Sequence, residues 1–314
     1  MLYETIEEIL AAVASGKVSP DEADDLIAQL EAQAADGEGE PAPSPVPEDT
    51  ASAEEPEEET FFDRLSRTIN DMFDKGDYIH QDFPGLAAGQ YIHSGIKGNI
   101  NGSIHAGAKV KYDLYGDLNG DLAGTIGGDV YGTISGSITE TGRIGGDLQG
   151  NLIGSLRGKI GGDVDGSISG DLTETASIGG DLKGDIDGSL RGKIGGDMDG
   201  SIGSDLAATG RIGGDLTGSI GGTLCGAIDG DLHGNIAGHI SPTGRIGGDF
   251  TGTLTGDLYG HIHGDCNIIC GNVYGRIDGD VSVIEGSIMP GAVIDGDVHK
   301  LLGENRGNVR GDIG

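Results

Sequence analysis

Aliphatic residues recur at every fourth position through the middle of the chain, with a glycine between each successive pair. One such run is Ile144, Leu148, Leu152, Leu156, Ile160, Val164, Ile168 and Leu172. A two-residue insertion then moves the next aliphatic residue to Ile178. The insertion returns every 34 residues, so the equivalent positions are Val110, Ile144, Ile178, Ile212 and Ile246. A fixed period of this kind is typical of a solenoid, in which each unit buries its apolar face by stacking on its neighbours.

The spacing predicts short strands rather than helices. A helix interior with a glycine in every turn would lose about 1 kcal/mol per glycine relative to alanine. In an extended chain the side chains alternate, so Leu148 and Leu152 point to one side while Asp147 and Gln149 point to the other. We therefore predict an all-β solenoid (a β-helix) over residues 91–314, with coils of 16 and 18 residues in alternation and four short sides per coil. At a strand spacing of about 4.8 Å, about thirteen coils would make a rod around 60 Å long.

Two columns of polar residues fit this coil length. Steps of 16 and 18 residues from Asp113 reach an acid each time, at Asp129, Asp147, Asp163, Asp181, Asp197, Asp215, Asp231, Asp249 and Asp265. The same steps from Lys109 reach mostly basic residues, which include Arg143, Lys159, Lys193, Arg211 and Arg245. Because a column of stacked aspartates repels itself, we expect the basic column to supply the counter-charge.

Residues 1–33 predict a small α-helical hairpin. Ile6 and Leu10 lie on the apolar stripe of its first helix, and Leu26 and Leu30 on that of its second. Between the helices, the run SPDE at residues 19–22 supplies an N-cap, a proline at the first helical position and a capping-box glutamate. The segment resembles the SHOCT-like hairpins that precede β-rich solenoids in several bacterial and archaeal proteins. The resemblance implies self-association or the docking of a protein partner.

Two further segments lead to the solenoid. Residues 34–58 are acidic and rich in proline and alanine, without apolar periodicity, which predicts a disordered linker. Residues 59–90 are expected to form an amphipathic helix, over 59–76, and the N-terminal cap of the solenoid. The apolar face of this helix consists of Phe62, Leu65, Ile69, Met72 and Phe73. We expect it to cover the first coil, and a weak membrane contact or the binding of a partner is the alternative.

The irregular coils at the two ends of the solenoid carry a second resemblance. HAGAKV at residues 105–110 and GSIMPGAVIDGDV at residues 286–298 resemble coils of the bactofilins, a family of polymer-forming cytoskeletal proteins. The resemblance implies a β-helical core between flexible termini, which associates end to end into non-polar filaments without nucleotide.

Metal-competent side chains occur in two places. HIHGDCNIIC contains His261, His263, Cys266 and Cys270. Alternation about Ile262 points both histidines outward and gives Cys266 an inward position, so we do not expect the four side chains to converge. The aspartate column, represented by Asp147, Asp163, Asp181 and Asp197, is a candidate for Ca²⁺. The nonapeptide repeat of calcium-binding β-rolls is absent from it.

Composition and charge narrow the function. A chain of 314 residues with 63 glycines, 4% aromatic residues and no tryptophan builds no conventional globular core. A net charge of −33 argues against binding to nucleic acid. No catalytic set or phosphate loop stands out, so we expect neither an enzyme nor a cofactor. MLYETIEEIL does not read as a signal peptide, and we expect a cytoplasmic protein, with membrane association as the alternative.

The sequence thus predicts a structural, polymer-forming scaffold of cytoskeletal type that assembles with itself through the ends of its solenoid. The alternative is a non-enzymatic binding or adaptor module, in which the hairpin docks a partner and the solenoid is a rigid spacer or a ligand surface, for example for Ca²⁺. An ice-binding face is not expected, because Thr253, Thr255 and the TET runs at 139–141 and 173–175 form no regular flat array.

Overall fold

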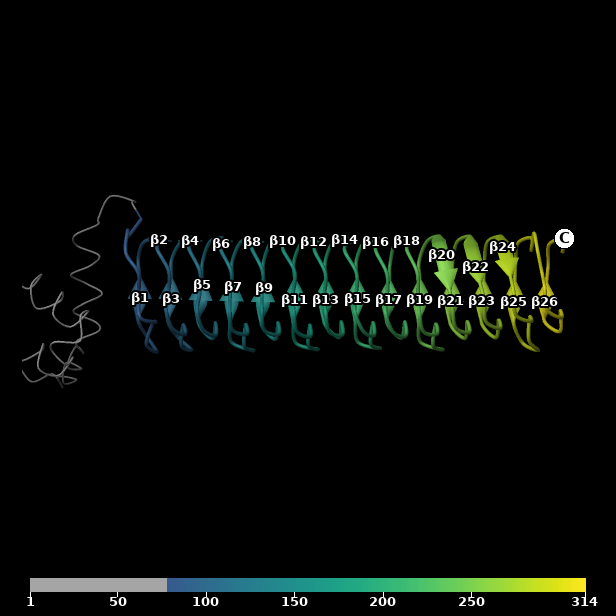
Figure 1. Ribbon diagram of the computed structural model, residues 1–314, viewed down its shortest axis with the longest axis horizontal. Coiled ribbons are helices and arrows are strands. Elements are labelled where there is room, and N and C mark those ends of the chain that lie inside the picture. Colours follow the sequence, from purple (N-terminus) through teal and green to yellow (C-terminus); the bar gives the residue numbers. More distant parts are fainter. Residues whose placement is uncertain (1–77) are drawn as a thin grey trace, which may run out of the picture. The chain divides into compact units, whose positions relative to one another are not determined.

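Residues 78–314 form a parallel β-solenoid in the computed structural model (Figure 1), and these are the residues that the structure describes. The predicted all-β solenoid is therefore confirmed. The predicted hairpin, linker and amphipathic helix, with their interaction residues from Ile6 to Phe73, lie outside the described residues.

Two parallel sheets run along the solenoid. Sheet 1 has 14 strands, which are β1 (Tyr91–Ile92), β3 (Lys109–Val110), β5 (Thr125–Ile126), β7 (Arg143–Ile144), β9 (Lys159–Ile160), β11 (Ser177–Ile178), β13 (Lys193–Ile194), β15 (Arg211–Ile212), β17 (Ala227–Ile228), β19 (Arg245–Ile246), β21 (His261–Ile262), β23 (Arg276–Ile277), β25 (Val293–Ile294) and β26 (Asn308–Val309). Sheet 2 has 12 strands, which are β2 (Ile96–Lys97), β4 (Leu114–Tyr115), β6 (Val130–Tyr131), β8 (Leu148–Gln149), β10 (Val164–Asp165), β12 (Leu182–Lys183), β14 (Met198–Asp199), β16 (Leu216–Thr217), β18 (Leu232–His233), β20 (Phe250–Leu254), β22 (Cys266–Ile269) and β24 (Val281–Ile284).

The alternation of 16- and 18-residue coils is confirmed by the register of these strands. Ile126 pairs with Val110, sixteen residues earlier, and with Ile144, eighteen residues later. Isolated bridges add two more columns, one through Ile134 and Leu152 and the other along the next side of the coil. Each regular coil thus has four sides, as the spacing of the aliphatic residues predicts.

The stack extends beyond the regular repeat at both ends. Parallel bridges begin at Ile79, Phe83 and Leu86, so pairing between coils starts before residue 91. At the other end β20, β22 and β24 are four or five residues long, whereas the other strands have two. The coil length also changes there. Cys266 pairs with Val281, fifteen residues later, and Val281 pairs with Val298, seventeen residues later.

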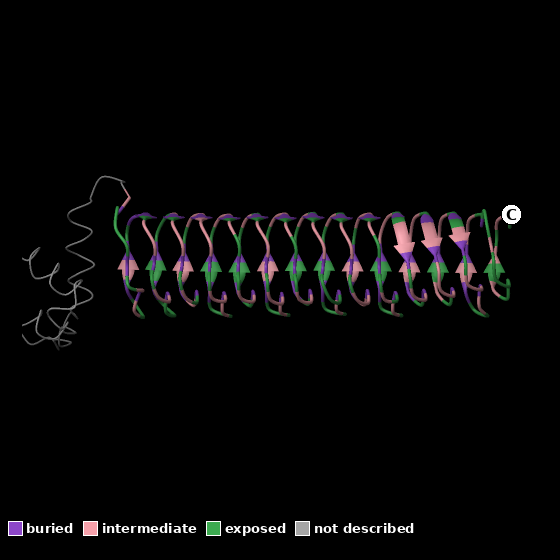
Figure 2. Cartoon of the chain, viewed as in Figure 1, coloured by how far each residue is buried: buried purple, intermediate pink, exposed green. Residues whose placement is uncertain are grey.

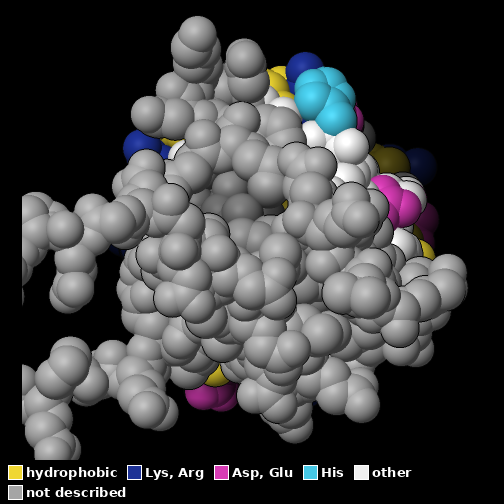
Figure 3. All heavy atoms as spheres, turned by 90° about the vertical axis from the view of Figure 1, so that its left-hand side faces the viewer, with side chains coloured by type: hydrophobic (Ala, Val, Ile, Leu, Met, Phe, Trp, Pro, Cys, Tyr) yellow, Lys and Arg dark blue, Asp and Glu magenta, His cyan; other side chains and the backbone are white. Residues whose placement is uncertain are grey.

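Four columns of aliphatic side chains fill the inside of the coils. One coil contributes Ile144, Leu148, Leu152 and Leu156, and each of these is 0% exposed. Figure 2 shows buried positions recurring from coil to coil. Full burial of such a side chain stabilises the fold by about 1.5–3 kcal/mol. Where described residues are visible in Figure 3, the outer surface carries basic, acidic and histidine side chains.

The aspartate column is held by backbone hydrogen bonds. We call it the Asp ladder, and its members are Asp113, Asp129, Asp147, Asp163, Asp181, Asp197, Asp215, Asp231, Asp249, Asp265, Asp280, Asp297 and Asp312. In each step the backbone N–H of one aspartate donates to Oδ1 of the aspartate in the preceding coil, over 2.7–2.9 Å. A carboxylate that accepts a backbone N–H is stabilised in its charged form.

This arrangement corrects the expected counter-charge. Among residues 78–314 no ion pair joins the Asp ladder to the basic column that starts at Lys109. Basic-column residues that do form ion pairs use a different column, as Arg211 does with Asp229 and Arg276 with Asp278. The prediction failed because it counted only side-chain charges, whereas the partner of each ladder carboxylate is a peptide N–H.

The ladder explains the glycine that precedes most of its aspartates. A Cβ atom on Gly180 would lie 1.8 Å from Oδ1 of Asp163, in the preceding coil. Tyr112 precedes the first ladder residue, Asp113, and here the preceding coil has Gly95 at the corresponding place and no carboxylate. A side chain is therefore accepted where no ladder residue lies beneath it.

The motifs HAGAKV and GSIMPGAVIDGDV form the same corner of the coil. In HAGAKV the N–H of Ala108 donates to the carbonyl of His105, and near the carboxyl end Ala292 makes the same bond to Met289. Each turn contains a glycine with positive φ, 83° at Gly107 and 93° at Gly291. The glycines are needed there for the backbone conformation, since a Cβ on either would meet little or no steric conflict.

We predict that Gly180→Ala destabilises the solenoid by about 1–3 kcal/mol, because the new methyl group displaces the Asp163 carboxylate from its ladder bond. The penalty should shrink in an Asp163→Ala background, where the clashing oxygen is gone. Urea denaturation of the two single variants and the double variant measures this coupling. An equal penalty in both backgrounds would show that the ladder is not the reason for the glycine.

Candidate functional site

The repeat changes its chemistry in the coils that follow β19. Two residues after the start of a sheet 1 strand, most of the coils from β1 to β19 have a glycine, such as Gly145 or Gly161. From β21 onward the same column carries His263, Asp278, Asp295 and Arg310. With His261 and Arg276 from the neighbouring basic column, these four residues form what we call the charged cluster.

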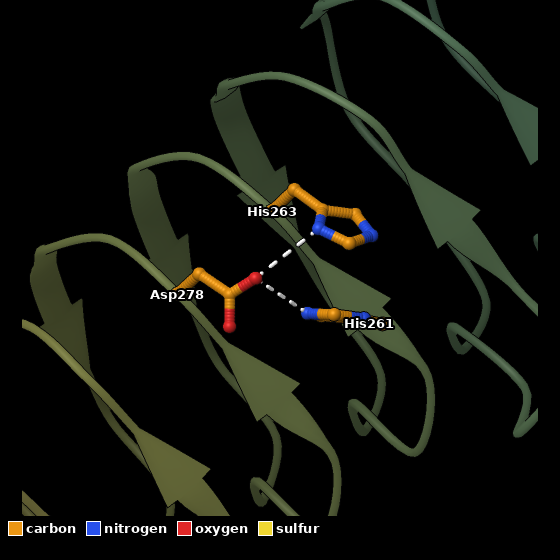
Figure 4. Close-up of side chains that lie close together, drawn as sticks. All are labelled: His261, His263 and Asp278. Carbon is orange, nitrogen blue, oxygen red and sulfur yellow. Dashed lines mark hydrogen bonds and ion pairs between the residues drawn. The ribbon is translucent and has the colours of Figure 1, made fainter.

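Two histidines and an aspartate meet within the charged cluster (Figure 4). His261 lies on β21 and His263 directly follows it, so alternation about the buried Ile262 brings both rings to the outer face. Asp278 directly follows β23 in the next coil. Its Oδ2 lies 2.9 Å from Nε2 of His261 and 3.1 Å from Nδ1 of His263. The two ring centroids are 3.7 Å apart.

Arginines hold the other side of this group. Arg276 donates to Oδ1 of Asp278 and also pairs with Asp295, which in turn pairs with Arg310 of the following coil. Four successive coils are thus linked through alternating charges on one face. Oδ2 of Asp278 remains directed at the two histidines, because Oδ1 is occupied by Arg276.

The surroundings keep His263 neutral and Asp278 ionised. Burial lowers the pKa of His263, and the charges of His261 and Arg245 lower it further. Its Nε2 is shielded from water and has no hydrogen-bond partner, which also disfavours the doubly protonated ring. Burial acts to raise the pKa of Asp278, but the hydrogen bonds from Arg276 and His261 lower that pKa on balance.

The cysteines take no part in this group. Cys266 is 2% exposed and lies at the inward position that alternation assigns to it. Burial raises the pKa of its thiol, and the charge of Asp265 adds to the effect. Cys270 and Cys225 are partly exposed, and all three thiols are free. The pKa of the Cys270 thiol is raised as well, mainly by burial and to a smaller extent by a hydrogen bond with Glu285.

Asp278 is the residue that sequence reasoning missed. It was expected that the histidines would not converge with the cysteines, and in the structure they converge instead on an aspartate one coil away. The step from His263 to Asp278 is fifteen residues, which breaks the alternation of sixteen and eighteen. The signal was the replacement of glycine by side chains in one column, and it becomes readable only once this change of register is known.

The ladder aspartates named as calcium candidates lie in consecutive coils. A hollow over them is lined by Asp147, Asp163 and Asp181, with Lys183 beside them. Oδ1 of each of these aspartates already accepts the next N–H of the ladder. In the described part of the chain, no three ladder carboxylates bring donor atoms together as the histidine group does.

The last coil of the described residues is less covered than the others. Ile313 pairs with Val298 in an aliphatic column, and it is 42% exposed where Val298 is 0% exposed. Leu301 and Val309 continue two other columns and are half-buried. Asn305 replaces an aliphatic residue in the fourth column, above Ile288.

No protein-family model matches this sequence, and no curated protein matches it. Among solved structures, the chain is similar to a hyperactive, Ca²⁺-dependent, β-helical antifreeze protein from an Antarctic bacterium. The two are 20% identical, the match covers 75% of this chain and 81% of that chain, and the TM-score is 0.27. Within residues 78–314 there is no helix long and apolar enough to cross a bilayer.

We predict that Asp181→Asn leaves the free energy of unfolding within about 0.5 kcal/mol of the wild-type value, or raises it. The amide oxygen still accepts the N–H of Asp197, while one charge leaves the acidic column. Asp181→Ala should lower the free energy of unfolding by about 1 kcal/mol, because it removes the acceptor. Urea denaturation with and without Ca²⁺ provides the measurement. If Ca²⁺ bound the ladder, it would raise the stability of the wild type, and Asp181→Asn would cancel that gain.

We also predict that two thiols react in the folded protein at pH 8 and that the third reacts only after unfolding. The nucleophile is the thiolate. The side chain of Cys266 is buried and the pKa of its thiol is raised, so little thiolate forms and the reagent does not reach it. Titration with a chromogenic disulfide, in buffer and in denaturant, counts the reactive groups. Cys266→Ala is the control, since it should abolish the denaturant-dependent thiol and leave the other two unchanged. Three thiols reacting at a single rate would contradict the inward position of Cys266.

Proposed function

We propose that this chain is a non-enzymatic structural scaffold that assembles with itself through the carboxyl-terminal coil of its solenoid. The observation that carries the proposal is the repetition of one coil along residues 78–314, because a coil can offer a second copy of the chain the same aliphatic columns that it offers its own neighbour. In the interior of a solenoid each such column is buried by the coil that follows.

The backbone of this coil supports the proposal. In the coil before it, the carbonyl of Ile284 accepts the N–H of Leu302, and the carbonyl of Val298 accepts the N–H of Gly314, both over 2.9 Å. Leu301 and Ile313 continue the columns of Ile284 and Val298 one coil further on, where their own carbonyls stand at the equivalent places. Exposed edges of this kind template the addition of further strands.

A second copy of this chain is the occupant that matches the edge. Its coils have the same length and the same four aliphatic columns. Charge favours the contact as well. Residues 301–314 hold two acids, Glu304 and Asp312, and two bases, Arg306 and Arg310, so this end escapes the self-repulsion that a net charge of −33 implies elsewhere.

The proposed assembly is of the cytoskeletal type that the bactofilin resemblance implies, and it would take place in the cytoplasm. Contact at the carboxyl-terminal coil alone gives paired rods. A filament needs a second contact, for which the amino-terminal part of the chain, with Ile6, Leu10, Leu26 and Leu30, is the proposed source. A protein partner that docks on the same residues remains the alternative function.

We predict that the full-length protein forms paired rods or filaments of uniform width, and that Ile313→Arg converts them into single rods by placing a charge in the contact. Ile153→Arg is the matched control, because Ile153 is 54% exposed in the middle of the solenoid and should leave assembly unchanged. Negative-stain microscopy and sedimentation velocity over a range of salt concentrations provide the measurements. Wild-type protein that stays monomeric throughout would overturn the proposal and favour the adaptor function.

A further inference from the structure

Within residues 78–314, one group of three metal-ligating side chains has donor atoms that all lie within 4.8 Å of one another, and it consists of His261, His263 and Asp278. The geometry points to a binding site for a divalent transition-metal ion, with zinc as the best match, that joins the coil of β21 to the coil of β23.

The donor distances are close to those that a metal requires. Ligand atoms about 2.0–2.2 Å from a tetrahedral zinc ion lie roughly 3.4 Å from one another. Oδ2 of Asp278 lies 2.9 Å and 3.1 Å from the two histidine nitrogens. Small side-chain rotations that move the ligand atoms apart by a few tenths of an ångström would open the group enough to admit the ion. The three side chains are 27–30% exposed, so they have room to make this adjustment.

The fold orients the ligands before any ion binds. His261 and His263 are two residues apart on one outer face, which is a spacing that strand geometry brings side by side. The backbone N–H of Asp278 donates to the carbonyl of Ile262 over 3.0 Å and fixes the two coils in register. Arg276 holds Oδ1 of Asp278, so Oδ2 faces the histidines, in the way that outer hydrogen bonds commonly orient metal ligands.

The donor set selects the class of metal. Two imidazoles and one carboxylate suit zinc and its neighbours in the first transition row, whereas Ca²⁺ and Mg²⁺ prefer sets made of oxygen alone. Neutral imidazole is the form that binds a cation, and the surroundings of His263 favour that form. Three protein ligands leave one tetrahedral position open to the outer surface, for water or for a ligand from another molecule.

One nearby charge opposes the ion. Arg245 of β19 pairs in register with His261, and its positive charge acts on His263. Replacing it by a neutral residue should strengthen metal binding by a few-fold, while loss of a ligand should weaken it. Variants on the two sides of the site thus shift the affinity in opposite directions, which a loss of folding cannot imitate.

The experiment is a titration of the chelator-treated full-length protein with Co²⁺, followed by its visible absorption, and with Zn²⁺ in competition. We expect one saturable site that lacks the absorption band of a thiolate ligand. His263→Ala and Asp278→Asn should each weaken it at least about tenfold, and Arg245→Gln should strengthen it. Zn²⁺ should raise the melting temperature of the wild type and not that of His263→Ala.

His239→Ala is the matched control, because His239 is a surface histidine 4.0 Å from the carboxylate of Asp257 without a second histidine in the group. The affinity of the His239→Ala variant for Co²⁺ should equal that of the wild type. Absence of saturable binding in the micromolar range would overturn the inference. Binding that survives in His263→Ala and Asp278→Asn would overturn it as well, since the ion would then be held elsewhere on the chain.

Discussion

The register between successive coils is the constraint on which this solenoid depends. Most strands are only two residues long, so each contributes few of the hydrogen bonds that normally keep a sheet in place. A slip of one residue would turn every aliphatic side chain outward. The Asp ladder opposes such a slip, because each bond joins a carboxylate to the N–H of the equivalent aspartate in the next coil. Aliphatic burial provides most of the stability, and the ladder decides which residue stacks on which.

Part of the high glycine content follows from this bond, and the rest from the close approach of backbone atoms in adjacent coils. A carboxylate turned toward the next coil occupies the space that a Cβ atom would need, as at Gly180 above Asp163. The high glycine content is thus a steric consequence of close stacking and not a mark of a mobile chain. Tyr112 supports the same explanation, since a large residue takes the place of glycine where the preceding coil has no carboxylate.

The fold could be predicted from the sequence because its determinants are periodic. Val110, Ile144 and their equivalents set the coil length, and register then places every aliphatic column. The partners of the Asp ladder could not be predicted in the same way, because a backbone N–H is present at almost every residue and leaves no mark in the sequence. Asp278 was missed for a different reason. It is brought to His263 only by the shortened coil that follows Cys266, and a period measured in the middle of the chain does not extend to that point.

Function in such a protein is expected where the repeat breaks. In a quasi-one-dimensional stack each coil contacts only its neighbours, so identical coils in the middle present the same surface many times over. After β19, glycine gives way to histidine, aspartate and arginine in one outer column, and the strands of sheet 2 lengthen. Within these coils, residues 301–314 include the exposed Ile313 and equal numbers of acids and bases. The regular coils set the distance between the two ends of the solenoid, and the irregular carboxyl-terminal coils carry the chemistry that distinguishes one end from the other.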